Sequence, residues 1–216
     1  MDAIFFDLDG TLTDPKPGIT RSIQYALGKL DHPTIPTEDE LTWCIGPPLH
    51  ASFATLLGAE TSADLALSYY RERFSDVGLY ENGVYAGIRD VLTALGQSGH
   101  RMFVATSKPR VFADRIIDHF ELRPHFERVF GSELDGTRVH KSDLLAYALR
   151  ETSVDPARAV MIGDRSHDIV GAKKNGMNAI GVAYGYGSRE ELIGAGASHV
   201  CATPRAILDH IDGKTG

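Results

Sequence analysis

The chain has 216 residues, of which 43% are hydrophobic and 24% charged, as is ordinary for a globular protein of one or two domains. Its net charge of -7 disfavours broad electrostatic attraction to a nucleic-acid polymer or to an anionic membrane. An anionic substrate remains compatible with this charge, because a bound metal ion reverses the local field.

Cysteine usage and the N-terminal sequence favour a reduced, intracellular protein. Cys44 and Cys201 form no CxxC pair and have no histidine at metal-ligand spacing. Met1 and Asp2 lead directly into an apolar run, without a basic region or a small-residue cleavage site. No apolar run approaches the length that spans a bilayer. We expect a cytoplasmic monomer or homodimer.

Short apolar runs predict the buried strands of a parallel sheet. The first run stops at an acidic pair followed by Gly10, which is typical of a strand that ends in a functional loop. In chain order, the predicted strands are residues 3–6, 102–105, 128–130, 159–162 and 179–182. Helical patterns lie between them, for example at Ile88, Val91, Leu92 and Leu95. This alternation predicts an α/β fold with a Rossmann-like, doubly wound parallel sheet.

One stretch breaks the alternation of strands and helices. Residues 18–76 carry helical patterns and no strand pattern, and turn-rich segments at residues 13–18 and 80–85 bracket them. We therefore predict an inserted all-helical cap domain that controls substrate access. It should lie above the carboxyl end of the first strand, where open α/β sheets bind ligands. The predicted bounds are residues 16–82 for the cap, and residues 1–15 and 83–216 for the core.

Acidic side chains follow two of the predicted strands. Asp7 and Asp9 come directly after the first strand, and Asp164 follows a later one, with Asp168 close behind. If these strands lie side by side, the carboxylates crowd into one crevice, where like charges repel and raise one another's pKa. A hard divalent cation such as Mg²⁺ removes that cost.

A second set of side chains supplies donors for a phosphate group. Thr106 and Ser107 offer hydroxyls and amides at an expected strand-to-helix turn, where the helix dipole favours anions. Lys141, at the start of a predicted helix, would complete the charge balance. One carboxylate can then attack phosphorus as a nucleophile, and a second carboxylate two residues on can serve as acid and later as base.

These motifs resemble those of the haloacid dehalogenase superfamily of phosphohydrolases. The resemblance rests on Asp7-Leu8-Asp9-Gly10-Thr11, Thr106-Ser107-Lys108-Pro109, Lys141 and Gly163-Asp164-x-x-x-Asp168, in that order. The helical insertion resembles the first (C1) cap type of that superfamily, and the similarity extends from Phe5 to about Gly187. Thr106-Ser107-Lys108-Pro109 and the cap loop Ile45–Leu49 are similar to the phosphoglycolate phosphatase-like subgroup, although Ser107 stands where these enzymes more usually carry Asn.

The resemblance implies a role for each motif residue. Asp7 would be the nucleophile and a metal ligand, and Asp9 the acid and base that also lends its backbone carbonyl to Mg²⁺. Asp164 would bind Mg²⁺ directly, and Asp168 would bind it or orient its waters. The residues that would bind the phosphate or allow the tight turn beside it are Gly10, Thr106, Ser107, Lys108 and Lys141.

The resemblance thus implies a Mg²⁺-dependent phosphatase that hydrolyses a small phosphorylated metabolite through an aspartyl-phosphate. Phosphoglycolate is the first expected substrate, with a nucleoside 5′-monophosphate or a sugar phosphate as alternatives. A β-phosphoglucomutase-like phosphomutase shares all four motifs but needs a cap that binds a second phosphate. A dehalogenase would not need Asp9 or the full acidic cluster. A non-enzymatic phospho-receiver module would be much shorter and would lack the cap.

Other conspicuous residues are interpreted as structural. Trp43 is expected in the cap core or at the contact of the cap with the sheet domain, and His167 is expected to face solvent. The run Tyr184-Gly185-Tyr186-Gly187 lacks GxGxxG spacing and follows the wrong strand for a dinucleotide cofactor.

Overall fold

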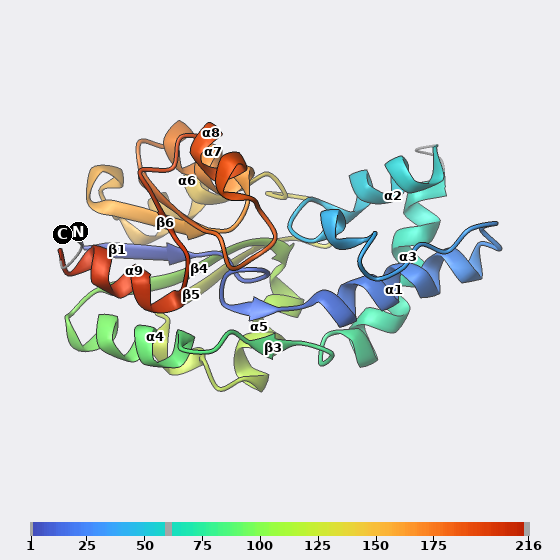
Figure 1. The fold of residues 1–216 in the computed structure, drawn as a ribbon, viewed down its shortest axis with the longest axis horizontal. Helices are drawn as coiled ribbons and strands as arrows, with labels where there is room; N and C mark the ends of the chain where they lie inside the picture. The colour runs from blue at the N-terminus through green and yellow to red at the C-terminus, as the bar shows by residue number, and fades with distance from the viewer. Residues whose placement is uncertain (1, 59–61, 214–216) are drawn as a thin grey trace. The chain divides into compact units, whose positions relative to one another are not determined.

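The structure, a computed structural model, describes residues 2–58 and 62–213 (Figure 1). The chain divides into two compact units, which we call the sheet unit (residues 1–14 and 84–216) and the helical unit (residues 15–83). Each junction lies one residue from the one that the turn-rich segments predict. Within the described residues, no helix has both the length and the apolar character needed to cross a bilayer.

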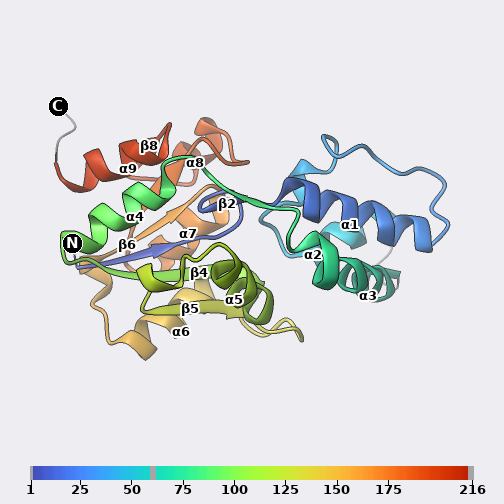
Figure 2. The ribbon, with the colours of Figure 1, turned by 90° about the horizontal axis from the view of Figure 1, so that it is seen from below.

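A six-stranded parallel sheet forms the centre of the sheet unit. Its order is β5-β4-β1-β6-β7-β8, so β1 lies between β4 and β6 (Figure 2). Each of the five predicted strands lies within one of these, and the predicted α/β fold is confirmed. The sixth strand, β8, is too short to give a pattern. The bounds are β1 (Ala3–Phe6), β4 (Arg101–Pro109), β5 (Arg128–Ser132), β6 (Ala159–Gly163), β7 (Asn178–Val182) and β8 (His199–Cys201).

Helices cover both faces of this sheet (Figure 1). Phe5 and Phe103 point to one face, where they join a buried cluster with Leu144 and Ile169 from the helices above. Side chains alternate between the two faces along each strand, so the neighbouring Ile4 and Phe6 are buried on the opposite face. The first face carries α6 (Lys141–Thr152), α7 (Ser166–Lys174) and α8 (Arg189–Gly194), and the second carries α4 (Ile88–Gln97), α5 (Arg110–His119) and α9 (Pro204–Ile211).

The register of the three central strands brings the predicted motifs to one edge of the sheet. Phe6 pairs with Val104 on one side and with Ile162 on the other. Asp7 therefore comes one residue past these pairs, beside the segments that carry Thr106 and Asp164. The carboxyl ends of parallel strands meet at this edge, as the sequence predicts.

Two short strands mark the places where the chain leaves the sheet unit and returns to it. These are β2 (Thr13–Asp14) and β3 (Gly83–Val84). Single helical turns occur elsewhere in the described chain, at η1 (Thr42–Cys44), η3 (Phe74–Gly78), η4 (Arg123–His125) and η5 (Pro156–Arg158).

The helical unit is built on α1 (Lys16–Lys29), α2 (Leu49–Leu57) and α3 (Ala63–Arg73). Its core includes Phe53, Tyr70 and Phe74, and the rings of Tyr70 and Phe74 are stacked at 5.1 Å. Trp43 keeps 40% of its surface exposed, so the first of its two predicted positions, in the core of this unit, is wrong. The second, at the contact with the sheet unit, stays a prediction. Tryptophan is highly buried on average but seldom completely buried, so residue type alone does not fix its exposure.

Phe103 provides a test of this core. Its side chain is 1% exposed and stacks on Phe5 at a centroid distance of 4.8 Å. We expect Phe103→Ala to lower the free energy of unfolding of the sheet unit by about 3–5 kcal/mol, as for other buried aromatic truncations. Chemical denaturation followed by circular dichroism measures this change. The matched control Val170→Ala, at an exposed position of α7, should cost less than about 0.5 kcal/mol; equal losses would contradict the assignment.

Candidate active site

Three carboxylates meet at the carboxyl edge of the sheet. Asp7 follows β1, Asp164 follows β6, and Asp168 lies in the first turn of α7. One oxygen from each carboxylate lies within 4.8 Å of the other two, and all three side chains are buried. The sequence predicts that Asp7, Asp9 and Asp164 crowd together with Asp168 close behind. The structure brings Asp7, Asp164 and Asp168 together, and it does not place the Asp9 carboxylate among them, because that side chain pairs with Lys108. We call these three residues the acid cluster.

Burial and mutual repulsion perturb the acid cluster. Burial raises the pKa of Asp7 to about 6, with further increases from Asp168 and Asp9 that the positive charge of Lys141 opposes. Burial also raises the pKa of Asp164 well above its usual range, and the charges of Asp168 and Asp7 add to the increase. The cluster is therefore short of positive charge.

Lys141 supplies one positive charge. Its Nζ lies 2.9 Å from Asp7 Oδ1 and 2.8 Å from Asp168 Oδ1, and it donates to the carbonyl of Ala105 at 2.7 Å. Burial alone would lower the pKa of Lys141, but Asp168 and Asp7 outweigh it and raise the pKa to about 12. Burial likewise acts to raise the pKa of Asp168, but Lys141 holds it below its usual value. The structure thus places Lys141 against the acid cluster, where the sequence analysis expects it to contribute to the charge balance, and its predicted contact with phosphate stays a prediction.

Asp9 points away from the acid cluster toward Lys108. Lys108 Nζ lies 2.9 Å from Asp9 Oδ2, and both side chains are less than a tenth exposed. The other carboxylate oxygen of Asp9 is buried and accepts no hydrogen bond. The side chain of Asp9 is therefore not among the three that meet in the acid cluster, and its predicted role as acid and base stays a prediction.

The turn after β1 requires a glycine. Gly10 has φ of +82°, and a Cβ there would lie 2.1 Å from Asp164 Oδ2. Thr11, which follows in the same turn, donates its hydroxyl to Asp164 Oδ1 at 3.4 Å. Close packing of the Gly10 backbone against Asp164 thus helps to fix the acid cluster.

Thr106 and Ser107 lie at a different kind of turn from the predicted one. β4 continues to Pro109 with an irregular register between Thr106 and Pro109, and α5 begins only at Arg110. The prediction that they sit at a helix N-terminus is wrong, because the strand extends past its apolar run. The Thr106 hydroxyl accepts from the Lys108 N–H at 3.2 Å, and the Ser107 carbonyl accepts from Ser132 Oγ at 2.7 Å.

Two residues near Asp164 differ from expectation. The prediction that His167 faces solvent is wrong: its side chain is 30% exposed, with Nε2 3.8 Å from Asp168 Oδ1, and burial lowers its pKa. Tyr186, which the motif analysis does not assign to the site, donates its main-chain N–H to Asp164 Oδ2 at 2.8 Å. The glycines on either side of Tyr186 are the sequence signal for such a close main-chain approach.

The acid cluster fits a hard divalent cation. Its donors are carboxylate oxygens, which suit Mg²⁺. Burial raises the pKa of Asp7 and of Asp164, the neighbouring carboxylates add to the increase, and a bound cation would offset both effects. Lys141 balances only one of the three negative charges.

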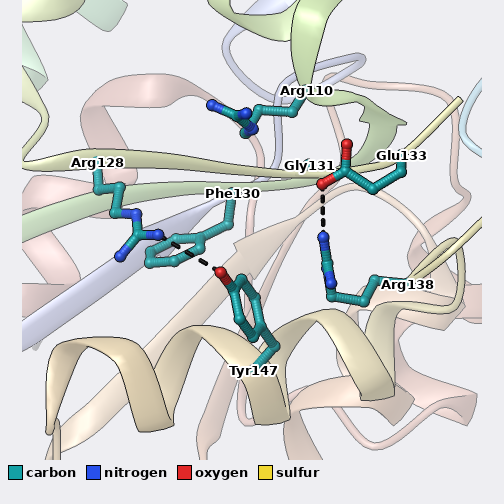
Figure 3. A pocket seen from close by; sticks show the side chains of 7 residues that line it. All are labelled: Arg110, Arg128, Phe130, Gly131, Glu133, Arg138 and Tyr147. Carbon is teal, nitrogen blue, oxygen red and sulfur yellow. Dashed lines mark hydrogen bonds and ion pairs between the residues drawn. The ribbon is translucent and has the colours of Figure 1, made fainter.

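A separate pocket of about 170 Å³ lies beside the edge strand β5 (Figure 3). Three arginines line it together with Phe130 and Tyr147. Each guanidinium has a carboxylate partner, the pairs being Arg110 with Asp114, Arg128 with Glu151 and Arg138 with Glu133. The arginine charge is therefore balanced locally, and none of the predicted site residues lines this pocket. We place the chemistry at the acid cluster.

Comparison with known proteins gives matches along most of the chain. The family model for haloacid dehalogenase-like hydrolases matches residues 4–182. A 5′-nucleotidase of Pseudomonas aeruginosa is 49% identical, over 94% of this chain and 92% of its own. The tyrosine-protein kinase PtkA of Mycobacterium tuberculosis is 40% identical, over 96% of this chain and 70% of its own. A phosphoglycolate phosphatase of Caulobacter vibrioides is 32% identical, over 85% of this chain and 79% of its own.

Solved structures share this fold. The crystal structure of a predicted phosphatase from Clostridium acetobutylicum superimposes with a TM-score of 0.95 at 41% sequence identity. The match covers 98% of each chain, so it includes both the sheet unit and the helical unit.

Lys141→Met tests the electrostatics of the acid cluster. The substitution keeps a long side chain but leaves the buried carboxylates of Asp7 and Asp168 without their cation. We expect the free energy of unfolding of the metal-free protein at neutral pH to fall by about 3–5 kcal/mol, as when one partner of a buried ion pair is removed. Urea denaturation measures it. The control Lys174→Met, at an exposed position of α7, should change it by less than about 0.5 kcal/mol; a similar small change for Lys141 would contradict the ion pairs.

Proposed function

The chain belongs to the haloacid dehalogenase-like hydrolase family, and we propose that it hydrolyses small phosphate monoesters by nucleophilic attack of Asp7. Within this family it is a phosphoric monoester hydrolase. The observation that carries the proposal is the buried Asp7 carboxylate, held by Lys141 at the edge of the sheet with Asp9 two residues away.

Asp7 would act as the nucleophile. Its pKa of about 6 leaves the carboxylate ionised at neutral pH, and the Lys141 ammonium fixes its orientation. A bond would form between a carboxylate oxygen of Asp7 and phosphorus while the ester P–O bond breaks, which gives an aspartyl-phosphate and an alcohol. Water would then attack phosphorus, release inorganic phosphate and regenerate Asp7.

Asp9 would move the protons. It would give a proton to the leaving oxygen in the first step and take one from the attacking water in the second. The ion pair with Lys108 must first be exchanged, because an ammonium partner requires the ionised carboxylate whereas donation requires the protonated one. A phosphate oxygen is an equivalent partner for Lys108. This exchange supports the predicted role of Lys108 in phosphate binding.

Mg²⁺ is the proposed cofactor. Asp7, Asp164 and Asp168 would hold it, together with the backbone carbonyl of Asp9. When bound, it would neutralise charge on the phosphoryl oxygens. Thr106, Ser107 and the turn at Gly10 would contact the same phosphoryl group.

For the substrate, we propose a nucleoside 5′-monophosphate first and phosphoglycolate second. The order follows the relatives, since the 5′-nucleotidase is the more similar in sequence and the more completely covered. We further propose that the helical unit selects among small free metabolites, and that neither a nucleic-acid polymer nor a membrane is a partner. A phosphomutase is the alternative, distinguished by formation of an isomer of a sugar phosphate without release of phosphate.

Asp7→Asn should lower kcat for every monoester by at least about 10³-fold, because the nucleophile is lost. Phosphate release from nucleoside 5′-monophosphates, phosphoglycolate and a sugar phosphate measures this loss and ranks the substrates.

Asp9→Asn should instead slow hydrolysis by about 10²–10⁴-fold. The phosphoenzyme should then accumulate from an aryl phosphate, and mass spectrometry after acid quenching detects it. The control Asp90→Asn, on the exposed side of α4, should be unaffected. An Asp7→Asn enzyme as active as the parent would refute the mechanism.

Removal of divalent cations should abolish turnover, and added Mg²⁺ should restore it. A second measurement does not depend on activity: Mg²⁺ at about 100 times its dissociation constant should stabilise the parent by about 2.7 kcal/mol. Asp164→Asn should lose most of this stabilisation, because the cluster loses a buried ligand. Turnover retained in excess chelator, or equal stabilisation of parent and variant, would contradict the metal assignment.

A further inference from the structure

The segment Tyr184–Gly187, which follows β7, packs closely on Asp164. A Cβ at Gly185 would lie 2.5 Å from Asp164 Cβ, and a Cβ at Gly187 would lie 1.9 Å from the Asp164 carbonyl oxygen. Side chains at either position would displace the segment. The close approach lets Tyr186 donate its main-chain N–H to Asp164 Oδ2 at 2.8 Å. The main chain of this segment therefore forms one wall of the acid cluster.

The two tyrosine side chains of the segment reach the chain that leaves the sheet unit. The Tyr184 hydroxyl donates to the carbonyl of Thr11 at 2.9 Å. The Tyr186 hydroxyl donates to Asp14 Oδ1. Asp14 is the last residue of the sheet unit before the chain enters the helical unit. Two tyrosine hydroxyls of the segment thus hydrogen-bond the outgoing connection, residues 11–14. The bond to the Asp14 carboxylate is the stronger of the two, because its acceptor is charged.

The chain that returns to the sheet unit meets the same segment. Tyr85, the second residue of the sheet unit after the return, donates its N–H to the carbonyl of Leu12 at 3.1 Å. Its ring lies 5.1 Å from the ring of Tyr184, at an interplanar angle of 66°. Within the sheet unit, the outgoing connection (residues 11–14) and the returning connection (residues 84–85) therefore both contact the segment that hydrogen-bonds Asp164.

We propose that Tyr186 is a positioning residue that links the two connections to the acid cluster: its hydroxyl, through Asp14, fixes the main-chain N–H that orients Asp164. The consequence for catalysis rests on the proposed function, since it requires Asp164 to bind Mg²⁺. A backbone change at the junction after Asp14 shifts Asp164. Because coupling between two sites is reciprocal, Mg²⁺ at the acid cluster also restrains the junction.

Tyr186→Phe tests the link, because it removes one hydroxyl and keeps the ring. We expect Mg²⁺ affinity, measured by titration calorimetry without substrate, to fall about tenfold, as for other residues that orient a metal ligand. The kcat lost at low Mg²⁺ should return at high Mg²⁺, which a general loss of folding would not produce. The control Tyr147→Phe removes a hydroxyl that lies 3.5 Å from Arg128, away from the acid cluster, and should leave both quantities unchanged.

Asp14→Ala completes a double-mutant cycle. If Tyr186 acts through Asp14, the double variant binds Mg²⁺ no more weakly than either single variant. Additive losses, or unchanged affinity in Tyr186→Phe, would overturn the proposal. Hydrogen exchange of the Tyr186 amide gives a readout that needs no metal: it should accelerate at least about tenfold in Tyr186→Phe, and an unchanged rate would also overturn the proposal. If the parent binds no Mg²⁺, the metal assignment fails separately. Amide exchange then tests by itself whether the Tyr186 hydroxyl fixes the Tyr186 main-chain N–H.

Discussion

The repulsion among three buried carboxylates is the constraint on which this site depends. Asp7, Asp164 and Asp168 lie within 4.8 Å of one another, and one lysine neutralises a single charge among them. Buried charges cost several kcal/mol each unless they are paired. Burial raises the pKa of Asp7 and of Asp164, and the neighbouring carboxylates add to the increase. We propose that a cation completes this site, because it would offset the unpaired negative charge.

The sheet makes this arrangement possible by close backbone packing. Gly10 and Gly163 both lie against carboxylates of the cluster, where a Cβ would come within 2.1 Å of Asp164 Oδ2 and 2.4 Å of Asp168 Cβ. Three adjacent parallel strands with matched register then deliver the acids to one edge. The carboxylates are thus oriented before substrate arrives, which is the main source of electrostatic catalysis in a preorganised site.

Patterns in the sequence were sufficient for five of the six strands of the main sheet, because each of these contains a local apolar run. They were also sufficient for the meeting of Asp7 with Asp164, because these acids follow two such runs on adjacent strands. Three features depend instead on contacts between distant residues. The Lys108–Asp9 ion pair needs the irregular end of β4, where the strand outlasts its apolar run. The contact of Tyr186 with Asp164 and the partial burial of His167 need tertiary packing across the sheet edge. The roles of these residues in catalysis stay predictions.

The Lys108–Asp9 ion pair bears on when Asp9 is available for proton transfer. A carboxylate held by an ammonium at 2.9 Å cannot donate a proton, so Asp9 is unsuited to act as an acid while the pair persists. Lys141, by contrast, is committed to Asp7, Asp168 and the carbonyl of Ala105. We therefore propose different roles for the two lysines: Lys141 keeps its contact with Asp7, the proposed nucleophile, and Lys108 exchanges Asp9 for an incoming phosphate. We infer that binding of the phosphate is itself the event that releases Asp9 for proton transfer.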